Sequence, residues 1–358
     1  MLALSRRWHV DVKRMIAELE KSEDWHLIPK TPVLLLVYVG FIVATVFLPP
    51  CMDSSSYAAS IIDKQKRLET ITSPKLVLVG GSNLALGLDS SLLKRQLEIE
   101  PVNMGLTINC GLAFELEQVR DHLRQGDVVV ISPEYEYFMQ NARGNGWIFE
   151  LPKLLPEASL WTFKTTTESP VVIAGSFNTF SGWLRSKWDF WRGMANKYVA
   201  SGGQAGLLPP KNWGEKDFLG RKNFDSYGDL LGYLKVKPPE QICVENWQVD
   251  KINADAVKLL NNFARDAKAR GATVLLVPPP LPDTVFERHA VEIATIYNGL
   301  KEQVRIPFIA APERYEFPVG QFFDSYYHLR GSARQERSQR LSQDIRAHLS
   351  LADSASIE

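Results

Sequence analysis

The sequence has few cysteines, no surplus of charge and only one long apolar run. Its three cysteines are too few for a disulfide scaffold and lack the paired spacing of metal ligands. At most one bridge fits within the chain, and the pair to consider is Cys110–Cys243. Lys plus Arg and Asp plus Glu both number 41, so the net charge is zero and the basic surplus typical of nucleic-acid binding is missing. The 45% hydrophobic and 23% charged residues among 358 exclude a wholly disordered chain, a collagen-like rod and a polytopic membrane protein.

The apolar run, residues 33–48, decides the expected compartment. Its 16 residues contain no charge, and Pro32 and Pro49 flank it. As a helix it would span roughly 24 Å, short of the ~30 Å hydrocarbon core, so a buried core helix is the alternative. We favour an uncleaved signal anchor at residues 32–50, since no charged residue interrupts it.

The flanks of this run set the expected orientation. Six basic residues precede it, and the first one after it is Lys64. The positive-inside rule then places residues 1–31 in the cytoplasm. The sequence therefore predicts a single-pass protein of the cytoplasmic (inner) membrane, with the main domain extracytoplasmic, in the periplasm.

Short apolar runs alternate with helical periodicity over the rest of the chain. Between the runs, apolar residues recur at helix spacing, as at Leu112, Leu116, Val119 and Leu123. This alternation predicts an α/β fold, with a doubly wound (flavodoxin-like) five-stranded parallel sheet and helices on both faces. The expected strands are Lys75–Val79, Pro101–Asn103, Val128–Ser132, Thr273–Val277 and Ile306–Ile309.

The alternation of strand and helix patterns is interrupted in the middle of the chain. The predicted α/β domain comprises residues 74–140 and 251–350, after a helical connector at 51–73 and before a tail at 351–358. Residues 141–250 form an expected insertion that holds seven of the nine tryptophans. Such rings either stack on saccharides or build the insertion's own core, and the second reading is favoured.

Two constellations could carry chemistry. Ser82 follows two glycines directly after the first predicted strand, where α/β sheets place their ligands, although a serine N-cap explains it equally well. Asp324 and His328 lie in one loop before the last predicted helix. The carboxylate would hold the imidazole tautomer, and the histidine would deprotonate a serine. A structural histidine beside a surface aspartate is the alternative. Glu134 and Glu136 follow the third strand and could line the site, although an interpretation as ordinary surface glutamates is favoured.

Taken together, the glycine-flanked Ser82, the sequence Asn103-Met104-Gly105 after the second strand and the Asp324/His328 loop resemble the SGNH (GDSL-like) hydrolase superfamily. The resemblance is closest to its membrane-anchored branch of D-alanine transfer and alginate-type O-acetylation proteins, and covers residues 74–138 and 251–349. It implies that Ser82 is the nucleophile, His328 the base and Asp324 its orienting partner, with the backbone N–H groups of Ser82 and Gly105 as oxyanion donors.

The chain departs from the superfamily pattern in two ways. Three residues separate Asp324 from His328, where the superfamily has two. The asparagine that supplies a side-chain oxyanion donor has no counterpart after the third strand, and Asn83 or Asn109 are the possible substitutes.

The expected function is serine-dependent acyl transfer, as an esterase or O-acyltransferase on a cell-envelope or exported polysaccharide. The expected partners are that polysaccharide or an acyl donor, the membrane and other polysaccharide biosynthesis proteins, with no nucleic acid, no cofactor and no metal. The alternative is a non-catalytic glycan-binding or scaffold component of a polysaccharide export system. Phosphate binding by the Gly80-Gly81-Ser82 turn is weaker, since the chain has no Gly-Lys-Ser/Thr motif there.

Overall fold

The computed structural model describes residues 54–202, 217–239, 242 and 246–355, together with Leu36 and Gly40. The chain divides into one unit of Met1–Cys51 with Ser186–Leu208 and another of Met52–Arg185 with Pro209–Glu358. The second unit holds the sheet and both predicted constellations. The predicted anchor at residues 32–50 falls outside the described residues apart from Leu36 and Gly40. In the part of the chain that is described, no helix combines the length and apolar character needed to cross a bilayer.

The second unit is built on a four-stranded parallel sheet. Its strands are β1 (Lys75–Gly80), β2 (Glu100–Asn103), β3 (Val128–Ser132) and β4 (Thr273–Leu276), in the order β2-β1-β3-β4. The pairing of β1 with β3 runs from Leu76↔Val128 to Gly80↔Ser132, so the carboxyl ends of these two central strands lie side by side. A separate parallel pair joins β5 (Leu281–Pro282) to β6 (Glu316–Phe317).

The fifth predicted strand, Ile306–Ile309, is not a strand of this sheet. It makes one isolated parallel bridge, Leu276↔Phe308. Two hydrogen bonds define the bridge, from Leu276 N–H to Pro307 C=O and from Ile309 N–H to Leu276 C=O. Pro307 has no N–H to donate, which restricts a longer ladder. The parallel sheet therefore has four strands, and the prediction of a fifth strand at Ile306–Ile309 is wrong.

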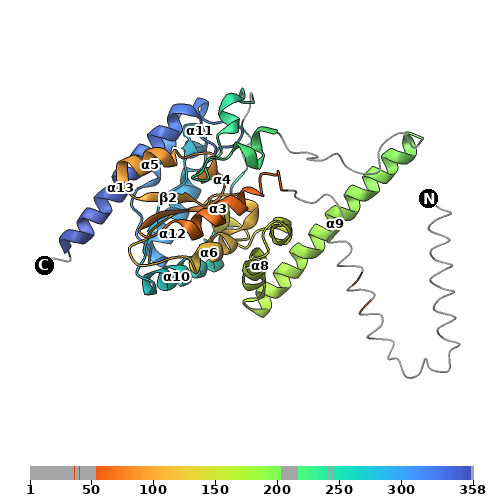
Figure 1. Cartoon of the computed structure of the whole chain (residues 1–358), viewed down its shortest axis with the longest axis horizontal. Coiled ribbons are helices and arrows are strands. Elements are labelled where there is room, and N and C mark those ends of the chain that lie inside the picture. Colours follow the sequence, from red (N-terminus) through yellow and green to blue (C-terminus); the bar gives the residue numbers. More distant parts are fainter. Residues whose placement is uncertain are drawn as a thin grey trace, which may run out of the picture. The chain divides into compact units, whose positions relative to one another are not determined.

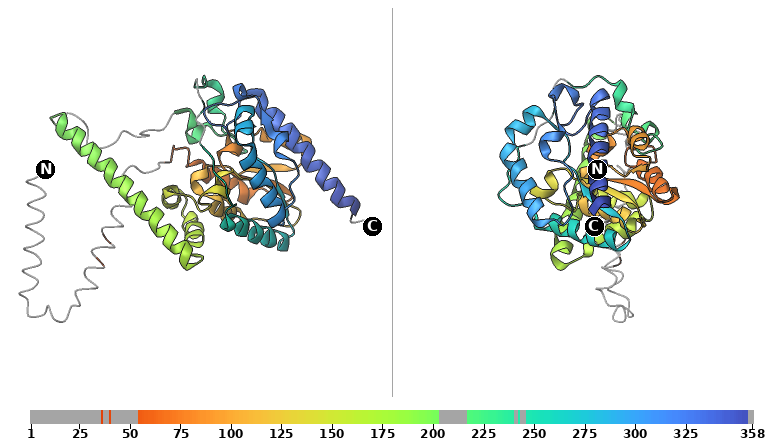
Figure 2. Two further views of the ribbon diagram at one scale, coloured as in Figure 1. Left: turned by 180° about the vertical axis from the view of Figure 1, so that it is seen from behind. Right: turned by 90° about the vertical axis from the view of Figure 1, so that its left-hand side faces the viewer.

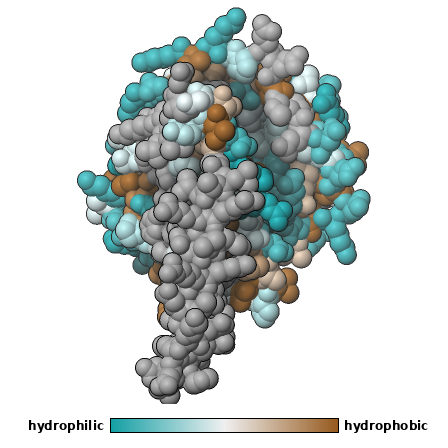
Figure 3. All heavy atoms as spheres, turned by 90° about the vertical axis from the view of Figure 1, so that its right-hand side faces the viewer, coloured by the Kyte–Doolittle hydropathy of each residue, from teal (hydrophilic) through white to brown (hydrophobic). Residues whose placement is uncertain are grey.

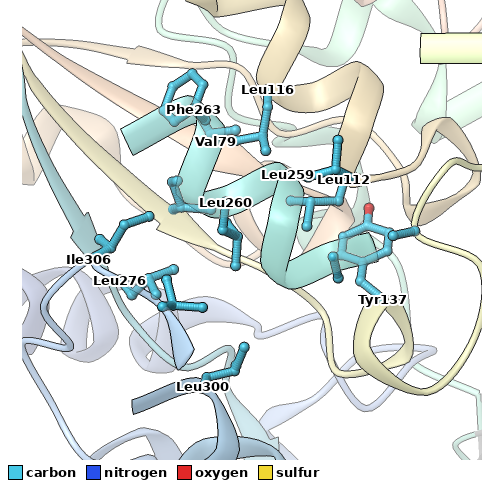
Figure 4. Packing of buried hydrophobic residues seen from close by; sticks show 14 of the residues in the cluster. Val79, Leu112, Leu116, Tyr137, Leu259, Leu260, Phe263, Leu276, Leu300 and Ile306 are labelled. Carbon is cyan, nitrogen blue, oxygen red and sulfur yellow. The ribbon is translucent and has the colours of Figure 1, made fainter. Parts of the chain in front are cut away.

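Helices cover both faces of the sheet. Successive side chains of each strand point to opposite faces, and the apolar side chains on both faces are buried under these helices. On one face Val77, Val79 and Ile131 pack with apolar side chains of α6 (Leu112–Arg120), α10 (Ala254–Ala269) and α12 (Ala290–Gln303). Figure 4 shows Val79 of this face near Leu116 and Phe263. On the other face Leu76 and Val130 pack against α5 (Ser90–Leu97) and α13 (Gly331–Ala355), which lie opposite α6 and α10 in Figures 1 and 2. The helices are α3 (Ser60–Thr70), α4 (Ser82–Ala85), α5 (Ser90–Leu97), α6 (Leu112–Arg120), α7 (Glu136–Met139), α8 (Ala158–Thr167), α9 (Pro170–Ala200), α10 (Ala254–Ala269), α11 (Asp283–Arg288), α12 (Ala290–Gln303) and α13 (Gly331–Ala355).

Parts of the predicted insertion pack on the sheet domain. Trp161 of α8 meets the Phe114 ring of α6 edge-on, at 5.8 Å between ring centroids. Trp247 stacks on His289 at 4.7 Å, and Tyr233 packs on Phe323 next to the His328 loop. Because Trp161 and Trp247 are buried, their rings build core and are not open platforms for a sugar. The apolar side chains that do reach the face shown in Figure 3 lie scattered among hydrophilic ones.

Cys110 is a free, buried thiol. Cys243 itself falls outside the described residues. Burial among apolar groups raises the pKa of the Cys110 thiol, with Glu115 adding to the effect. The thiol behaves as a small core side chain.

Candidate active site

Ser82 lies at the carboxyl end of β1, where the chain turns sharply into α4. The turn is possible because Gly81 has no side chain: a Cβ there would lie 2.6 Å from Glu134 Oε1. None of the described residues accepts a hydrogen bond from the Ser82 backbone N–H. The hydroxyl is half-buried and faces the loop that precedes α13.

That loop brings the predicted residues together. His328 Nε2 lies 2.9 Å from Ser82 Oγ, and His328 Nδ1 lies 2.7 Å from Asp324 Oδ1. The tight turn is closed by hydrogen bonds between Phe323 N–H and His328 C=O and between His328 N–H and Ser325 C=O. This turn thus accommodates the third residue between Asp324 and His328, where the superfamily has two. With a proton on Nδ1 shared with Asp324, Nε2 is the acceptor that faces the serine.

A hydroxyl in this arrangement can act as a nucleophile. The base lies within hydrogen-bond reach of the serine and is in turn oriented by a carboxylate, which is the geometry that nucleophilic catalysis needs. His328 and Asp324 keep 16% and 25% of their side-chain surface exposed, so the serine is accessible at the rim of the sheet. Among the residues described here, no group of three His, Cys, Asp or Glu side chains is arranged to hold a metal ion.

Glu134 is a fourth group at the serine. It follows β3 and is 1% exposed, so its interpretation as a surface residue is wrong. Its Oε1 lies 3.2 Å from Ser82 Oγ and accepts hydrogen bonds from Asn83 N–H at 3.1 Å and Asn83 Nδ2 at 3.4 Å. Burial and the nearby charge of Glu136 raise the pKa of Glu134 to about 7, against the lowering effect of these hydrogen bonds.

Asn83, named as a possible oxyanion donor, is fully buried and already engaged. Its Nδ2 donates to Ser132 C=O at 3.0 Å as well as to Glu134. Arg337 of α13 holds both oxygens of Asn83, donating to Asn83 C=O at 2.6 Å and to Asn83 Oδ1 at 2.9 Å. The amide therefore orients Glu134 and does not face an open site. Asn109, the other named substitute, hydrogen-bonds Asn145 through its Oδ1.

Gly105 lies directly beside the serine turn. A Cβ at this position would lie 2.8 Å from Gly81 C=O and 2.6 Å from Leu84 Cβ, so only glycine allows this approach. Its N–H, however, donates to Asn103 Oδ1 at 3.0 Å. The expected second backbone donor is thus occupied, which leaves the Ser82 N–H as the unengaged one.

Glu136 is also buried, contrary to its interpretation as a surface residue. The hydroxyls of Tyr326 and Tyr327 both donate to its carboxylate, the second at 2.8 Å. Tyr327 Oη also accepts from Tyr135 N–H at 3.0 Å. These hydrogen bonds connect the His328 loop to the segment that carries Glu134.

Sequence reasoning named Glu134 as a residue that could line the site but favoured a surface position for it, and it missed Arg337. The signal for Glu134 was its position two residues beyond β3, since β3 is the strand next to β1. No sequence signal singled out Arg337 from the other arginines of its helix. No protein-family model matches the chain, and a search of the curated proteins gave no match. The SGNH resemblance therefore depends on the quoted residues alone.

Proposed function

We propose that the protein is a serine-dependent acyl esterase or O-acyltransferase. The observation that supports this most directly is the continuous chain from Ser82 Oγ through the His328 ring to Asp324, with contacts of 2.9 and 2.7 Å. The strand order β2-β1-β3-β4, followed by the Leu276↔Phe308 bridge, is consistent with the flavodoxin-like arrangement of SGNH hydrolases.

The chemistry follows from the positions of the three side chains. Ser82 Oγ attacks an ester carbonyl while its proton passes to His328 Nε2, and Asp324 stabilises the resulting imidazolium. The leaving alcohol departs with the proton from His328, which leaves an acyl group on Ser82. Water then completes ester hydrolysis, or a sugar hydroxyl completes acyl transfer.

The expected setting is the periplasmic face of the cytoplasmic membrane, with a cell-envelope or exported polysaccharide as the acyl acceptor or substrate. This part of the proposal comes from the apolar run at residues 33–48 and from the superfamily resemblance, and function assigned through a fold family is an analogy. A tethered enzyme would meet a glycan as the glycan leaves the membrane.

The test is ester turnover by the full-length chain, purified in detergent. The wild type should hydrolyse p-nitrophenyl acetate, and Ser82→Ala should reduce turnover to the rate of the buffer. Ser91→Ala is the matched control, because Ser91 lies on α5 and hydrogen-bonds Asp89 and Arg95, two side chains of its own turn and helix. Equal turnover by Ser82→Ala and the wild type would rule out Ser82 as the nucleophile.

A non-catalytic scaffold is the second candidate, and one observation favours it. The Gly105 N–H is occupied by Asn103 Oδ1, so a donor expected of an active oxyanion hole is withdrawn. A fluorophosphonate probe separates the two, since it reacts with an activated serine. Labelling at Ser82 supports the enzyme, whereas an unlabelled but folded protein supports the scaffold.

A further inference from the structure

Glu134 is a buried carboxyl in contact with the reacting oxygen, and the Ser82–His328–Asp324 chain does not use it. Its Oε1 lies 3.2 Å from Ser82 Oγ. Two donors of Asn83 hold it there, and Gly81 leaves the space that it fills. Because this carboxyl is held in contact with the nucleophile, its protonation state must affect the reaction.

The count of protons at Ser82 favours a neutral Glu134. The serine has one hydroxyl proton and two acceptors, His328 Nε2 and Glu134 Oε1. In the arrangement ready for attack that proton points to His328, whose own proton is shared with Asp324. The contact between Ser82 and Glu134 is then a hydrogen bond only when the carboxyl brings a proton of its own.

The surroundings of Glu134 also favour the neutral form. No lysine or arginine within the described ranges forms an ion pair with it, and a buried carboxylate without such a partner is costly. The charged or titratable groups that face it, besides Ser82's partner His328, are Glu136, Glu115, Tyr57, Tyr137, Tyr327 and Arg337. The Arg337 guanidinium is directed to Asn83 and Ser132. Burial together with Glu136 raises the pKa of Glu134 to about 7.

The neutral and ionised forms of Glu134 would have opposite effects on the reaction. When Ser82 Oγ bonds to an ester carbon, the electron pair of the C=O bond moves to an oxygen only two bonds from Oγ. A carboxylate at Glu134 would repel this oxyanion, whereas a carboxylic acid would donate a hydrogen bond to it. A carboxyl kept neutral in an apolar site can serve as such a donor.

We propose that Glu134 is a catalytic residue that acts as a neutral acid, donating a hydrogen bond to the oxyanion formed on Ser82, and that its ionisation switches acyl transfer off. This inference depends on the proposed function. In the step, the Oγ–C bond forms, the serine proton passes to His328 and the carbonyl electron pair becomes the oxyanion. Collapse restores the carbonyl and breaks the bond to the leaving alcohol, which takes the proton from His328. Glu134 keeps its proton throughout.

The test compares pH profiles of kcat/KM for p-nitrophenyl acetate between pH 5 and 9 on the full-length chain. The wild-type activity should fall above about pH 7, as Glu134 ionises. Glu134→Gln, which stays neutral and keeps N–H donors, should retain activity within about tenfold and lose the fall above pH 7. Glu134→Ala should lose on the order of 10²–10³ in kcat, as for the loss of an oxyanion donor.

A control and an independent readout complete the design. Glu117→Gln alters a carboxyl that is paired with Arg120 on α6, away from Ser82, and should leave the profile unchanged. Fluorophosphonate labelling of Ser82 should follow the same pH dependence. Loss of activity in Glu134→Gln to the level of the alanine variant, or a wild-type profile that stays flat above pH 7, would overturn the role of Glu134. Absence of any Ser82-dependent turnover or labelling in the wild type would overturn the proposed function as well.

Discussion

Arg337 hydrogen-bonds Asn83, the residue after Ser82, and its removal should both destabilise the fold and reduce activity. The side chain is 1% exposed and donates to Asn83 C=O, Asn83 Oδ1 and Ser132 Oγ at 2.6, 2.9 and 3.1 Å. Burial lowers the pKa of its guanidinium to about 10, so it remains charged at neutral pH. Arg337→Met keeps most of the apolar volume and removes all of these donors.

The expected magnitude follows from the acceptors left behind. A buried polar group without a partner costs about 1–3 kcal/mol, and Asn83 C=O is left in that state. Asn83 Oδ1 and Ser132 Oγ keep their bond to each other, so the bonds that they lose from Arg337 add about 1 kcal/mol each. The relief of burying a charge offsets part of this loss, so we expect the free energy of unfolding to fall by roughly 2–4 kcal/mol. Because Asn83 follows Ser82 directly, ester turnover should fall by about 10²-fold from misplacement of the nucleophile.

Urea unfolding followed by tryptophan fluorescence measures the first effect, and turnover of p-nitrophenyl acetate by the folded protein measures the second. Arg346→Met is the matched control, because Arg346 lies on the same helix and is exposed. It should change the free energy of unfolding by less than about 0.5 kcal/mol. If Arg337→Met were no more destabilising than this control, the reasoning about the arginine would be refuted.

Three further outcomes are expected. Asp324→Asn should lower kcat by roughly 10²–10⁴, since the amide no longer holds the His328 tautomer, and unchanged turnover would speak against that role. Gly105→Ala should cost about 1–3 kcal/mol in chemical unfolding, because its Cβ meets backbone at 2.8 Å, whereas Gly182→Ala, in open space on α9, should gain about 0.5–1 kcal/mol. Raising the pKa of Glu134 from 4.5 to about 7 means that the native state holds a proton which the unfolded state has lost. Its contribution of roughly 3 kcal/mol is therefore present below pH 4.5 and lost as pH rises to about 7. Glu134→Gln should remove this slope from a series of unfolding measurements, and an identical slope in both proteins would contradict the assignment.

The local periodicity of the sequence determined most of the secondary structure. Runs of β-branched and leucine residues predicted β1, β3 and β4 nearly to their bounds. Apolar steps of three and four predicted α6, because burial on one face needs this spacing. The one failure at the sheet, Ile306–Ile309, arises because an apolar run alone does not report whether its backbone finds a partner. Pro307 limited that pairing to a single bridge.

The residue types at the site were also readable in advance, since a serine after a strand and an Asp/His pair in a loop have few common uses. Only the tertiary structure decided what surrounds them. Glu134 and Arg337 each received their role from α4, which lies far from both along the chain. The Gly105 N–H is occupied by the nearby Asn103 side chain, a choice of partner that the sequence does not reveal. Burial, proton affinity and the choice between hydrogen-bond partners depend on distances in space, and a pattern of neighbours along the chain does not contain them.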